Sequence, residues 1–356
     1  MEIVNVELGD RAYPIYVGAG CLEDLGPRLA QTGGEKRMAV VTNSTVASLY
    51  LEPVTRTLTG AGFDPAVVQI PDGEEHKNLA WLAFVYDRLI DAGVDRGGSV
   101  VALGGGVVGD LAGFAAATYL RGIDLVQVPT TLLAQIDSSI GGKTGVNHPA
   151  GKNLLGAFKQ PRFVLADVEC LRTLPRREYV AGLAEVVKTG AILDAELFAL
   201  LEAELPDILR QERDLLVRVV RRCCQLKALV VAEDETEGGY RAILNFGHTL
   251  GHAIESLTDY TTFLHGEAVA IGMVAAARVS QQLGFCDATT VRRLSTLVDR
   301  CGLPTEVPSD LEREALALAM RTDKKALGGS IKFVCLEGIG RTRFERLGCD
   351  EIVRYI

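Results

Sequence analysis

The first half of the chain alternates short apolar runs, rich in β-branched residues, with segments of helical periodicity. Four runs are typical of buried strands: 37–41 (RMAVV), 65–70 (PAVVQI), 99–103 (SVVAL) and 123–128 (IDLVQV). Helical spacing of apolar residues is found in segments 44–58, 78–92 and 107–118. Strands that alternate with helices predict βαβ units, which build a mostly parallel sheet with helices on both faces.

The pattern changes after residue 175, where glycines become rarer and long helical segments take over. These segments are 176–191, 205–231, 246–257, 266–283 and 288–301, and only 331–336 (IKFVCL) is typical of a strand. We therefore expect a Rossmann-like α/β domain over residues 1–170 and an all-α domain over residues 171–356. A length of 356 residues agrees with two domains, and a cleft between them is the expected ligand site.

Charge and cysteine usage exclude several classes of protein. The net charge of −9 disfavours binding to nucleic acid, which depends on Lys and Arg contacts with phosphates. The longest apolar stretch, 100–120, contains several glycines and Asp110, so we expect no membrane span. The eight cysteines form no CxxC pair, and the first ten residues lack the features of a signal peptide. These observations predict a cytoplasmic protein with reduced thiols that are mostly small core residues.

A glycine-rich turn follows the run 99–103 and opens the next helical segment. Gly104, Gly106 and Gly109 match the spacing of a dinucleotide fingerprint, and a helix N-terminus presents free N–H groups to an anion. The match is weak by itself, since that fingerprint usually follows the first strand of its domain, and a tight strand–helix turn is the alternative. A second turn that could bind an anion, 129–133 (PTTLL), follows the next strand and favours a nucleotide site.

Segment 140–147 (IGGKTGVN) superficially resembles a P-loop. A P-loop requires glycine where this chain has Asp137, so we reject that interpretation. The segment instead supplies Asp137 and Lys143, and the following GKN supplies Lys152 and Asn153. Two lysines in one loop suit a phosphate or carboxylate ligand, although a solvated surface loop would have the same composition.

Three of the five histidines lie close together in the helical half. His248 and His252 are four residues apart, on one face of a predicted helix, and His265 follows. This spacing predicts a metal site with His248 and His252 as co-ligands. There is no HExxH motif, and the spacing leaves the carboxylate ligand open among Glu185, Asp234, Glu235, Glu255 and Glu267.

Glu185 and Lys188 lie three residues apart in an otherwise apolar helical segment. A simple salt bridge between neighbouring turns is one interpretation. A functional role is the other, because a buried carboxylate is costly unless it is paired or binds a metal.

Long motifs along nearly the whole chain resemble those of the 3-dehydroquinate synthases, a family of sugar-phosphate cyclases. They are PDGEEHKN (71–78), ALGGGVVGDLAGFAAATYLRGI (102–123), VPTTLLAQIDSSIGGKTGVNHPAGKNLLGAF (128–158), TLPRREYVAGLAEVVKTG (173–190), EDETEGGYRAILNFGHTLGHAIE (233–255), HGEAVAIGM (265–273) and DKK (323–325). The resemblance implies an NAD-binding α/β domain, a helical metal-binding domain and a homodimer. It also implies the second step of the shikimate pathway, in which transient oxidation, β-elimination of phosphate, re-reduction and aldol closure give 3-dehydroquinate.

The resemblance also implies site residues. Glu185, His248 and His265 would hold Zn²⁺ or Co²⁺, whereas His252 would lie beside the substrate, in conflict with the spacing of the two helical histidines. Catalytic roles are implied for Asp137, Lys143, Lys188, Arg241, Asn245 and His252. Further substrate contacts are implied for Asn153, Lys227 and Lys324, and for Arg121 of the partner subunit. NAD contacts are implied for Glu74, Lys77, Gly105, Gly106, Val107, Asp110, Thr130, Thr131, Leu133, Lys152, Thr173, Leu174 and Glu178.

Three other functions share parts of this pattern. A metal-dependent polyol dehydrogenase has the same layout, but its neutral substrate needs no group of lysines and arginines. A sugar-phosphate cyclase of secondary metabolism would differ in a few substrate contacts, and Lys227, Arg241, Asn245 and His252 together favour the dehydroquinate branch. An inactive NAD-binding homologue would lack some catalytic side chains, and all of the expected ones are present.

Overall fold

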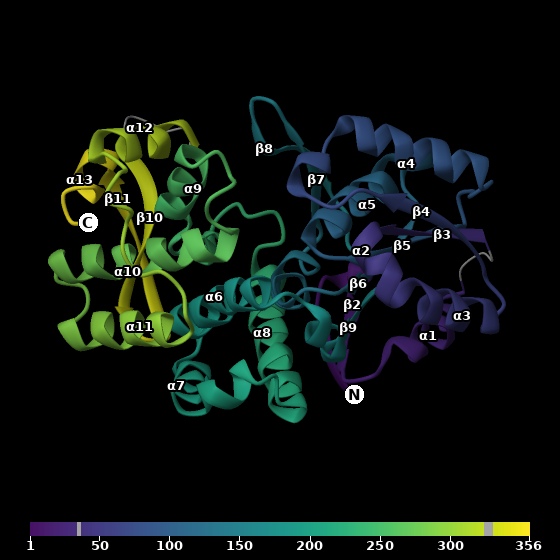
Figure 1. Ribbon diagram of the computed structural model, residues 1–356, viewed down its shortest axis with the longest axis horizontal. Helices are drawn as coiled ribbons and strands as arrows, with labels where there is room; N and C mark the ends of the chain where they lie inside the picture. Colours follow the sequence, from purple (N-terminus) through teal and green to yellow (C-terminus); the bar gives the residue numbers. More distant parts are fainter. Residues whose placement is uncertain (34–36, 324–329) are drawn as a thin grey trace. The chain divides into compact units, whose positions relative to one another are not determined.

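The computed structural model of the protein (Figure 1) describes residues 1–33, 37–323 and 330–356. Lys324, one of the predicted substrate contacts, lies outside the described residues. The chain forms two compact units, the first made of Met1–Leu174 and Leu216–Thr236, the second of Pro175–Leu215 and Glu237–Ile356. The division at 170/171 stays a prediction, and residues 216–236 group with the first unit.

A seven-stranded sheet forms the centre of the first unit. Its strands, in spatial order, are β1 (Glu2–Val6), β2 (Tyr13–Gly18), β9 (Phe163–Asp167), β6 (Asp124–Pro129), β5 (Ser99–Gly104), β3 (Arg37–Asn43) and β4 (Asp64–Ile70). Only the edge strand β1 runs antiparallel to its neighbour. The mostly parallel sheet and the four predicted strands are therefore confirmed, whereas β1, β2 and β9 were not predicted.

Helices cover both faces of this sheet, as predicted (Figure 1). Successive residues of β5 alternate between two cores: Val100 and Ala102 pack with helices α4 (Leu79–Asp91) and α5 (Gly106–Thr118). Val101 and Leu103 pack with α1 (Leu25–Gln31) and α3 (Glu52–Gly60) on the other face. Burial on both faces explains why β5 reads as a continuous apolar run.

The order of the strands creates a switch point between β3 and β5. From β3 the chain moves to β4 on one side and then to β5 on the other side, and all three strands are parallel. Their connections therefore leave the carboxyl ends of β3 and β5 in opposite directions, and nucleotide sites are typically found at such a point of a parallel sheet. The glycine-rich turn directly follows β5 and is therefore at this switch point.

Two segments of the chain differ from the sequence-based expectation. The predicted helix 205–231 is wrong as a single helix, because α7 (Ala195–Leu209) ends before α8 (Arg213–Glu233) begins. Gln211, with φ of 60°, adopts a left-handed conformation that interrupts the helix. The lysine-containing loop forms a hairpin of β7 (Lys143–His148) and β8 (Gly151–Phe158).

The second unit is helical, as predicted, but it also contains a β-hairpin. The helices are α6 (Arg176–Leu193), α7, α9 (His248–Leu257), α10 (His265–Gln282), α11 (Ala288–Arg300), α12 (Arg313–Asp323) and the short α13 (Cys349–Ile352). The hairpin pairs β10 (Ser330–Gly338) with β11 (Arg341–Gly348), shown in yellow in Figure 1. Only β10 was predicted, because β11 (RTRFERLG) is rich in charged residues and lacks the alternation of apolar and polar residues that is typical of a strand.

No helix in the described part of the chain is long and apolar enough to cross a membrane. All eight cysteines are free thiols and seven are buried, which agrees with the prediction that most are core residues. Burial raises the pKa of Cys21 to about 12, so this thiol is protonated and unreactive at neutral pH.

Candidate functional site

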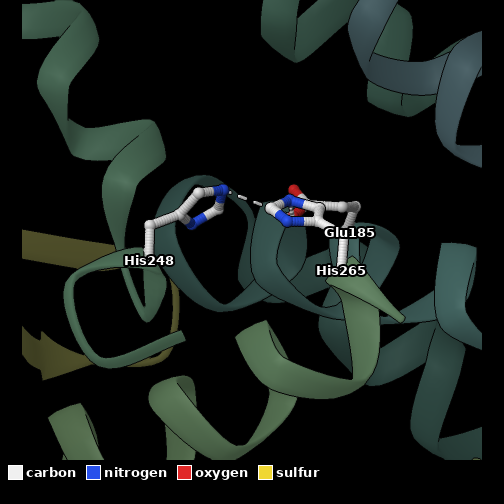
Figure 2. A group of neighbouring side chains, drawn as sticks. All are labelled: Glu185, His248 and His265. Atoms are coloured by element: carbon white, nitrogen blue, oxygen red, sulfur yellow. Dashed lines mark ion pairs between the residues drawn. The ribbon is translucent and has the colours of Figure 1, made fainter. Parts of the chain in front are cut away.

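Three helices of the second unit bring together one carboxylate and two histidines. Glu185 lies in the middle of α6, His248 is the first residue of α9 and His265 is the first residue of α10. Glu185 Oε1 is 3.6 Å from His248 Nε2 and 3.7 Å from His265 Nε2. Figure 2 shows the two rings approaching the same carboxylate. The possible ligand atoms all lie within 4.8 Å of one another.

The surroundings of Glu185 fit a metal ion. The residue is 1% exposed, and its Oε1 accepts no hydrogen bond from any residue that the structure describes. Its other oxygen is paired with the ammonium of Lys188, which is also buried. A buried oxygen without a partner is costly, and tetrahedral Zn²⁺ keeps its ligand atoms about 3.3–3.5 Å apart. The observed separations are close to that value, so the three residues could hold a divalent cation.

Both histidines are oriented through Nδ1. His248 Nδ1 lies 3.1 Å from the carbonyl oxygen of Phe246, and His265 Nδ1 lies 3.1 Å from Glu255 Oε2. Burial, together with Lys188 and the neighbouring histidines, holds the pKa of His248 well below its ordinary value. Burial also opposes the charge on His265, but the hydrogen bond to Glu255 and the nearby carboxylates outweigh it and raise the pKa. His248 is therefore neutral and has a lone pair to offer at Nε2.

Glycines allow the three helices to approach closely. A Cβ atom on Gly272 of α10 would lie 1.9 Å from the carbonyl oxygen of Gly247, the residue before α9. A Cβ atom on Gly266 would lie 1.9 Å from the carbonyl oxygen of Ala181 in α6. These contacts leave no room for a larger side chain, so they fix the separation of the segments that carry the three possible ligands.

The remaining histidine and carboxylate candidates have other neighbours. The His252 ring centroid is 5.4 Å from that of His248, but His252 groups with Glu255 and His265 rather than with Glu185. The predicted pairing of His248 with His252 is therefore wrong: within the described ranges, no group of possible ligand atoms contains both. Glu267 forms a salt bridge with Arg177, and Asp234 and Glu235 belong to the first unit.

The second unit also contains Arg241, Asn245 and Glu178, predicted to bind substrate or cofactor. Arg241 and Asn245 lie on the 3₁₀ turn that precedes α9, and Arg241 is almost fully buried. The Asn245 side-chain amide donates to Glu237 Oε1 at 3.0 Å. Glu178, in the first turn of α6, has a pKa raised by burial.

In the first unit, the glycine-rich turn lies beside the second predicted anion turn. Gly105 precedes α5 without any side-chain cap, and the N–H of Thr130 donates to the carbonyl oxygen of Gly104. A Cβ atom on Gly105 would lie 3.0 Å from Thr131 Cγ2, so the backbone of one turn packs closely against the other. Uncapped N–H groups at a helix N-terminus suit the pyrophosphate of a dinucleotide.

A buried lysine connects predicted cofactor and substrate residues. Lys77 is 4% exposed, and its Nζ donates to Asp110 Oδ2 at 2.5 Å and to Asn153 Oδ1 at 2.6 Å. Glu74 Oε1 is 3.9 Å away from the same ammonium. Burial raises the pKa of Asp110, although Lys77 partly offsets this. Asn147, which the sequence analysis missed, links Glu74 to the backbone N–H of Asn153.

A second lysine connects α8 to the segment after β6. Lys227 Nζ donates to the carbonyl oxygen of Asp137 at 2.6 Å and is also paired with its carboxylate. This contact places helix α8 beside the turn Ala134–Ser138, where Leu133 is the preceding residue. It is one of the contacts that join residues 216–236 to the first unit.

The other predicted residues of the first unit lie on separate elements. Val107 is in the first turn of α5, and Lys143 and Lys152 are on β7 and β8. Thr173 Oγ1 lies 2.5 Å from the Tyr50 hydroxyl, and Leu174 follows it. Arg121 is on an exposed turn after α5, where it has φ of 69°. The predicted residues within the described ranges are therefore divided between the two units.

Comparison with known proteins finds one family along most of the chain. Residues 67–181 match the family model described as 3-dehydroquinate synthase N-terminal, and residues 182–326 match the one described as 3-dehydroquinate synthase C-terminal. A curated 3-dehydroquinate synthase of Pelobacter propionicus is 55% identical over 353 residues, which cover 99% of this chain and 98% of that protein.

Two solved structures share the fold. The 2-epi-5-epi-valiolone synthase of Streptomyces hygroscopicus, with NAD+ and Zn2+ bound, is 30% identical with a TM-score of 0.89, over 98% of this chain and 96% of that one. A 2-deoxy-scyllo-inosose synthase, complexed with carbaglucose-6-phosphate, NAD+ and Co2+, is 28% identical with a TM-score of 0.87, over 99% of both chains.

Proposed function

The chain belongs to the 3-dehydroquinate synthase family, and we propose that it converts 3-deoxy-D-arabino-heptulosonate 7-phosphate into 3-dehydroquinate and phosphate. This reaction makes it a carbon–oxygen lyase of the shikimate pathway, which leads to chorismate and the aromatic amino acids. The observation that carries the proposal is the buried cluster of Glu185, His248 and His265. The curated relatives that match this chain over nearly their full length are named 3-dehydroquinate synthase.

NAD and a divalent metal, Zn²⁺ or Co²⁺, are the proposed cofactors. Support comes from the two solved relatives, which hold NAD+ with one of these metals. It also comes from the buried Glu185 oxygen, which accepts no hydrogen bond within the described residues, and from the α5 N-terminus, which has no side-chain cap there. When bound, NAD would supply reversible hydride transfer at a ring carbon. Oxidation to the ketone would acidify the adjacent C–H so that phosphate can be lost, and the hydride would be returned afterwards. The metal would polarise a substrate oxygen as a Lewis acid.

The basic side chains bind and orient the substrate, which carries a carboxylate and a phosphate. Lys188 and Arg241 serve this role in the second unit, and Lys143, Lys227 and the amide of Asn153 serve it in the first. Lys188 and Arg241 are almost fully buried, so their positive charges interact with an anion in surroundings of low polarity. These cations form a local basic environment within a chain whose net charge is −9.

Proton transfers are assigned to three groups. The leaving phosphate itself is the proposed base for the elimination step. His252 and Asp137 are assigned the remaining proton transfers, since imidazole and carboxylate side chains are common general acids and bases in enzymes. Lys227 holds the Asp137 carboxylate in place by binding its side chain and its backbone carbonyl.

The proposed enzyme is a cytosolic homodimer in which Arg121 reaches the neighbouring active site. Leu120, Arg121 and Gly122 have φ values of 50°, 69° and 119°, so three consecutive residues adopt left-handed backbone conformations. Such strain is retained where the surrounding structure or a function requires it. Eight cysteines, none of them in a disulfide within the described residues, suit a reducing compartment.

One experiment tests the function against its alternatives. The purified chain is incubated with the phosphorylated substrate, and phosphate release, NADH absorbance, product mass and bound zinc and NAD are measured. We expect phosphate release without net NADH and a product with the mass of 3-dehydroquinate. Net NADH formation from a polyol would instead support a dehydrogenase, and a different carbocycle would support another cyclase.

A further inference from the structure

His265 lies between two buried carboxylates, one at each ring nitrogen. Its Nδ1 is 3.1 Å from Glu255 Oε2, within hydrogen-bonding distance. Its Nε2 is 3.7 Å from Glu185 Oε1, which is too long for a hydrogen bond but suits two ligands of one ion. The two carboxylates therefore have different relationships with the same ring.

Helix α9 places Glu255 at this position. His248, His252 and Glu255 are four and three residues apart, so they lie along one face of α9. That face packs against the start of α10, where a Cβ atom on Gly251 would lie 3.2 Å from the backbone of Ala268. Because the backbones are so close, Glu255 reaches the first residue of α10, and the residue is only 3% exposed.

The other histidine is oriented in the same way by a different group. The His248 ring contacts the carbonyl oxygen of Phe246 through Nδ1 and turns Nε2 toward Glu185. A neutral histidine that donates from Nδ1 has its lone pair on Nε2. A carbonyl oxygen therefore orients one ring of the cluster, and a carboxylate orients the other.

We propose that Glu255 is a positioning residue for the metal site, which holds His265 through Nδ1 so that Nε2 binds the ion. The inference rests on the metal site proposed above. Carboxylates that accept from a ligating histidine fix its tautomer and increase its basicity, and their loss weakens metal binding by about 10- to 100-fold. Glu255 thus acts through His265, whereas Glu185 contributes an oxygen to the ion.

A second metal ion is the competing interpretation of the same residues. His252, Glu255 and His265 also offer ligand atoms within 4.8 Å of one another. Two ions would both require His265, one at each nitrogen, and the ring would then have to lose both of its N–H protons. A hydrogen bond from Nδ1 to Glu255 requires no such ionisation and agrees with the 3.1 Å separation.

The test compares Glu255→Leu and Glu255→Gln in the full-length chain. Leucine retains apolar volume in a buried site but cannot accept a hydrogen bond, whereas the glutamine carbonyl can still accept one from Nδ1. Zn²⁺ affinity of the metal-depleted protein is measured by competition with a chromogenic chelator, and the ligand field by the visible spectrum of the Co²⁺ form. We expect about a 10- to 100-fold loss of affinity and an altered spectrum for Glu255→Leu, and partial rescue by Glu255→Gln.

Glu202→Gln is the matched control. Glu202 is a partly buried carboxylate of the same unit and pairs with Arg293 through both oxygens. Its loss should leave the zinc affinity and the Co²⁺ spectrum unchanged. Circular dichroism of the metal-depleted variants checks that each one folds. If Glu255→Leu does not fold, the zinc affinity of Glu255→Gln is compared with that of the wild type instead.

Two results would overturn the inference. One is wild-type affinity and an unchanged spectrum in every folded Glu255 variant. The other is two ions per wild-type chain with the loss of one in Glu255→Leu, which would make Glu255 a ligand. A wild-type chain that binds no zinc would instead refute the proposed metal site itself, so the two failures are distinguishable.

Discussion

Arg177 and Glu267 form a two-point salt bridge in which Arg177 Nε and Nη2 each lie 2.7 Å from a different oxygen of Glu267. Arg177 is in the first turn of α6 and Glu267 is in the first turn of α10. The Glu267 carboxylate also accepts the backbone N–H of Leu264, and Arg177 donates to the carbonyl oxygen of Thr262. These contacts fix the segment that leads into His265 relative to the helix that carries Glu185.

Replacement of Glu267 by alanine should destabilise the protein by about 1–2 kcal/mol, since it removes a helix cap and a paired charge. Chemical denaturation of the metal-depleted chain measures this change. Arg56→Ala, which breaks the exposed pair of Arg56 with Glu52, is the control and should cost under about 0.5 kcal/mol. An equal loss of unfolding free energy in both variants would show that the Arg177–Glu267 contact stabilises the protein no more than an exposed ion pair does.

Glu185→Ala and His248→Ala should each remove the bound metal and the enzymatic activity together. Each variant takes away one of the three atoms proposed to surround the ion, and two remaining ligands bind Zn²⁺ poorly. Atomic absorption of the purified variants, measured beside turnover, gives both quantities. A variant that retains stoichiometric zinc would contradict the role of that residue as a ligand.

Lys143→Ala should reduce turnover without loss of zinc. Lys143 is on β7 of the first unit, whereas the three possible ligands belong to the second. Its proposed role is to bind an anionic group of the substrate, so the effect should appear in kcat/KM. Unchanged kinetics at all substrate concentrations would exclude Lys143 from substrate binding.

Gly272→Ala should destabilise the second unit by about 1–3 kcal/mol through overpacking and should weaken zinc binding. Its new methyl group would lie 1.9 Å from the carbonyl oxygen of Gly247, so α9 and α10 would have to separate. Gly60→Ala is the control, since Gly60 ends α3 and an added Cβ atom would meet nothing within 4 Å. That control should be neutral or stabilising by about 0.5 kcal/mol.

Asp110→Asn should change how stability depends on pH. Burial raises the folded-state pKa of Asp110 above its ordinary value of 3.8. In the window above that value the folded state binds more protons at this site, so the contribution of Asp110 to stability decreases as pH rises. Wild type should therefore lose stability relative to Asp110→Asn as pH increases through this window in denaturation experiments. A pH-independent difference between the two proteins would contradict the raised pKa.

The sequence predicted those parts of the fold in which the pattern of apolar residues directly reflects which side chains are buried. β5 is buried on both faces and reads as a continuous apolar run, and α5 begins at the glycine-rich turn that marks its start. In contrast, β11 alternates charged residues with others, and the helix interruption at Gln211 falls in the polar run RQERD (210–214), which the sequence analysis took as part of one helix. Polar residues are also common on the exposed face of a continuous helix, so this run alone did not identify the interruption.

The candidate site shows a similar limit. The spacing of His248 and His252 predicted that both bind metal, since residues four apart share a helix face. His265 begins a different helix, and its distance from His248 depends on how α9 and α10 pack. The contact between Glu255 and His265 depends on the same packing. Spacing along one helix cannot reveal such contacts between helices.

The grouping of residues 216–236 with the first unit has a consequence during synthesis. A ribosome delivers α6 and α7 of the second unit before it delivers the part of α8 that carries Lys227. The first unit therefore cannot be complete when its sheet leaves the ribosome. The second unit consists of two stretches of chain, separated by residues 216–236 of the first unit. A fragment that stops at Leu174 lacks a helix of its own unit, so neither unit can be produced by a single cut.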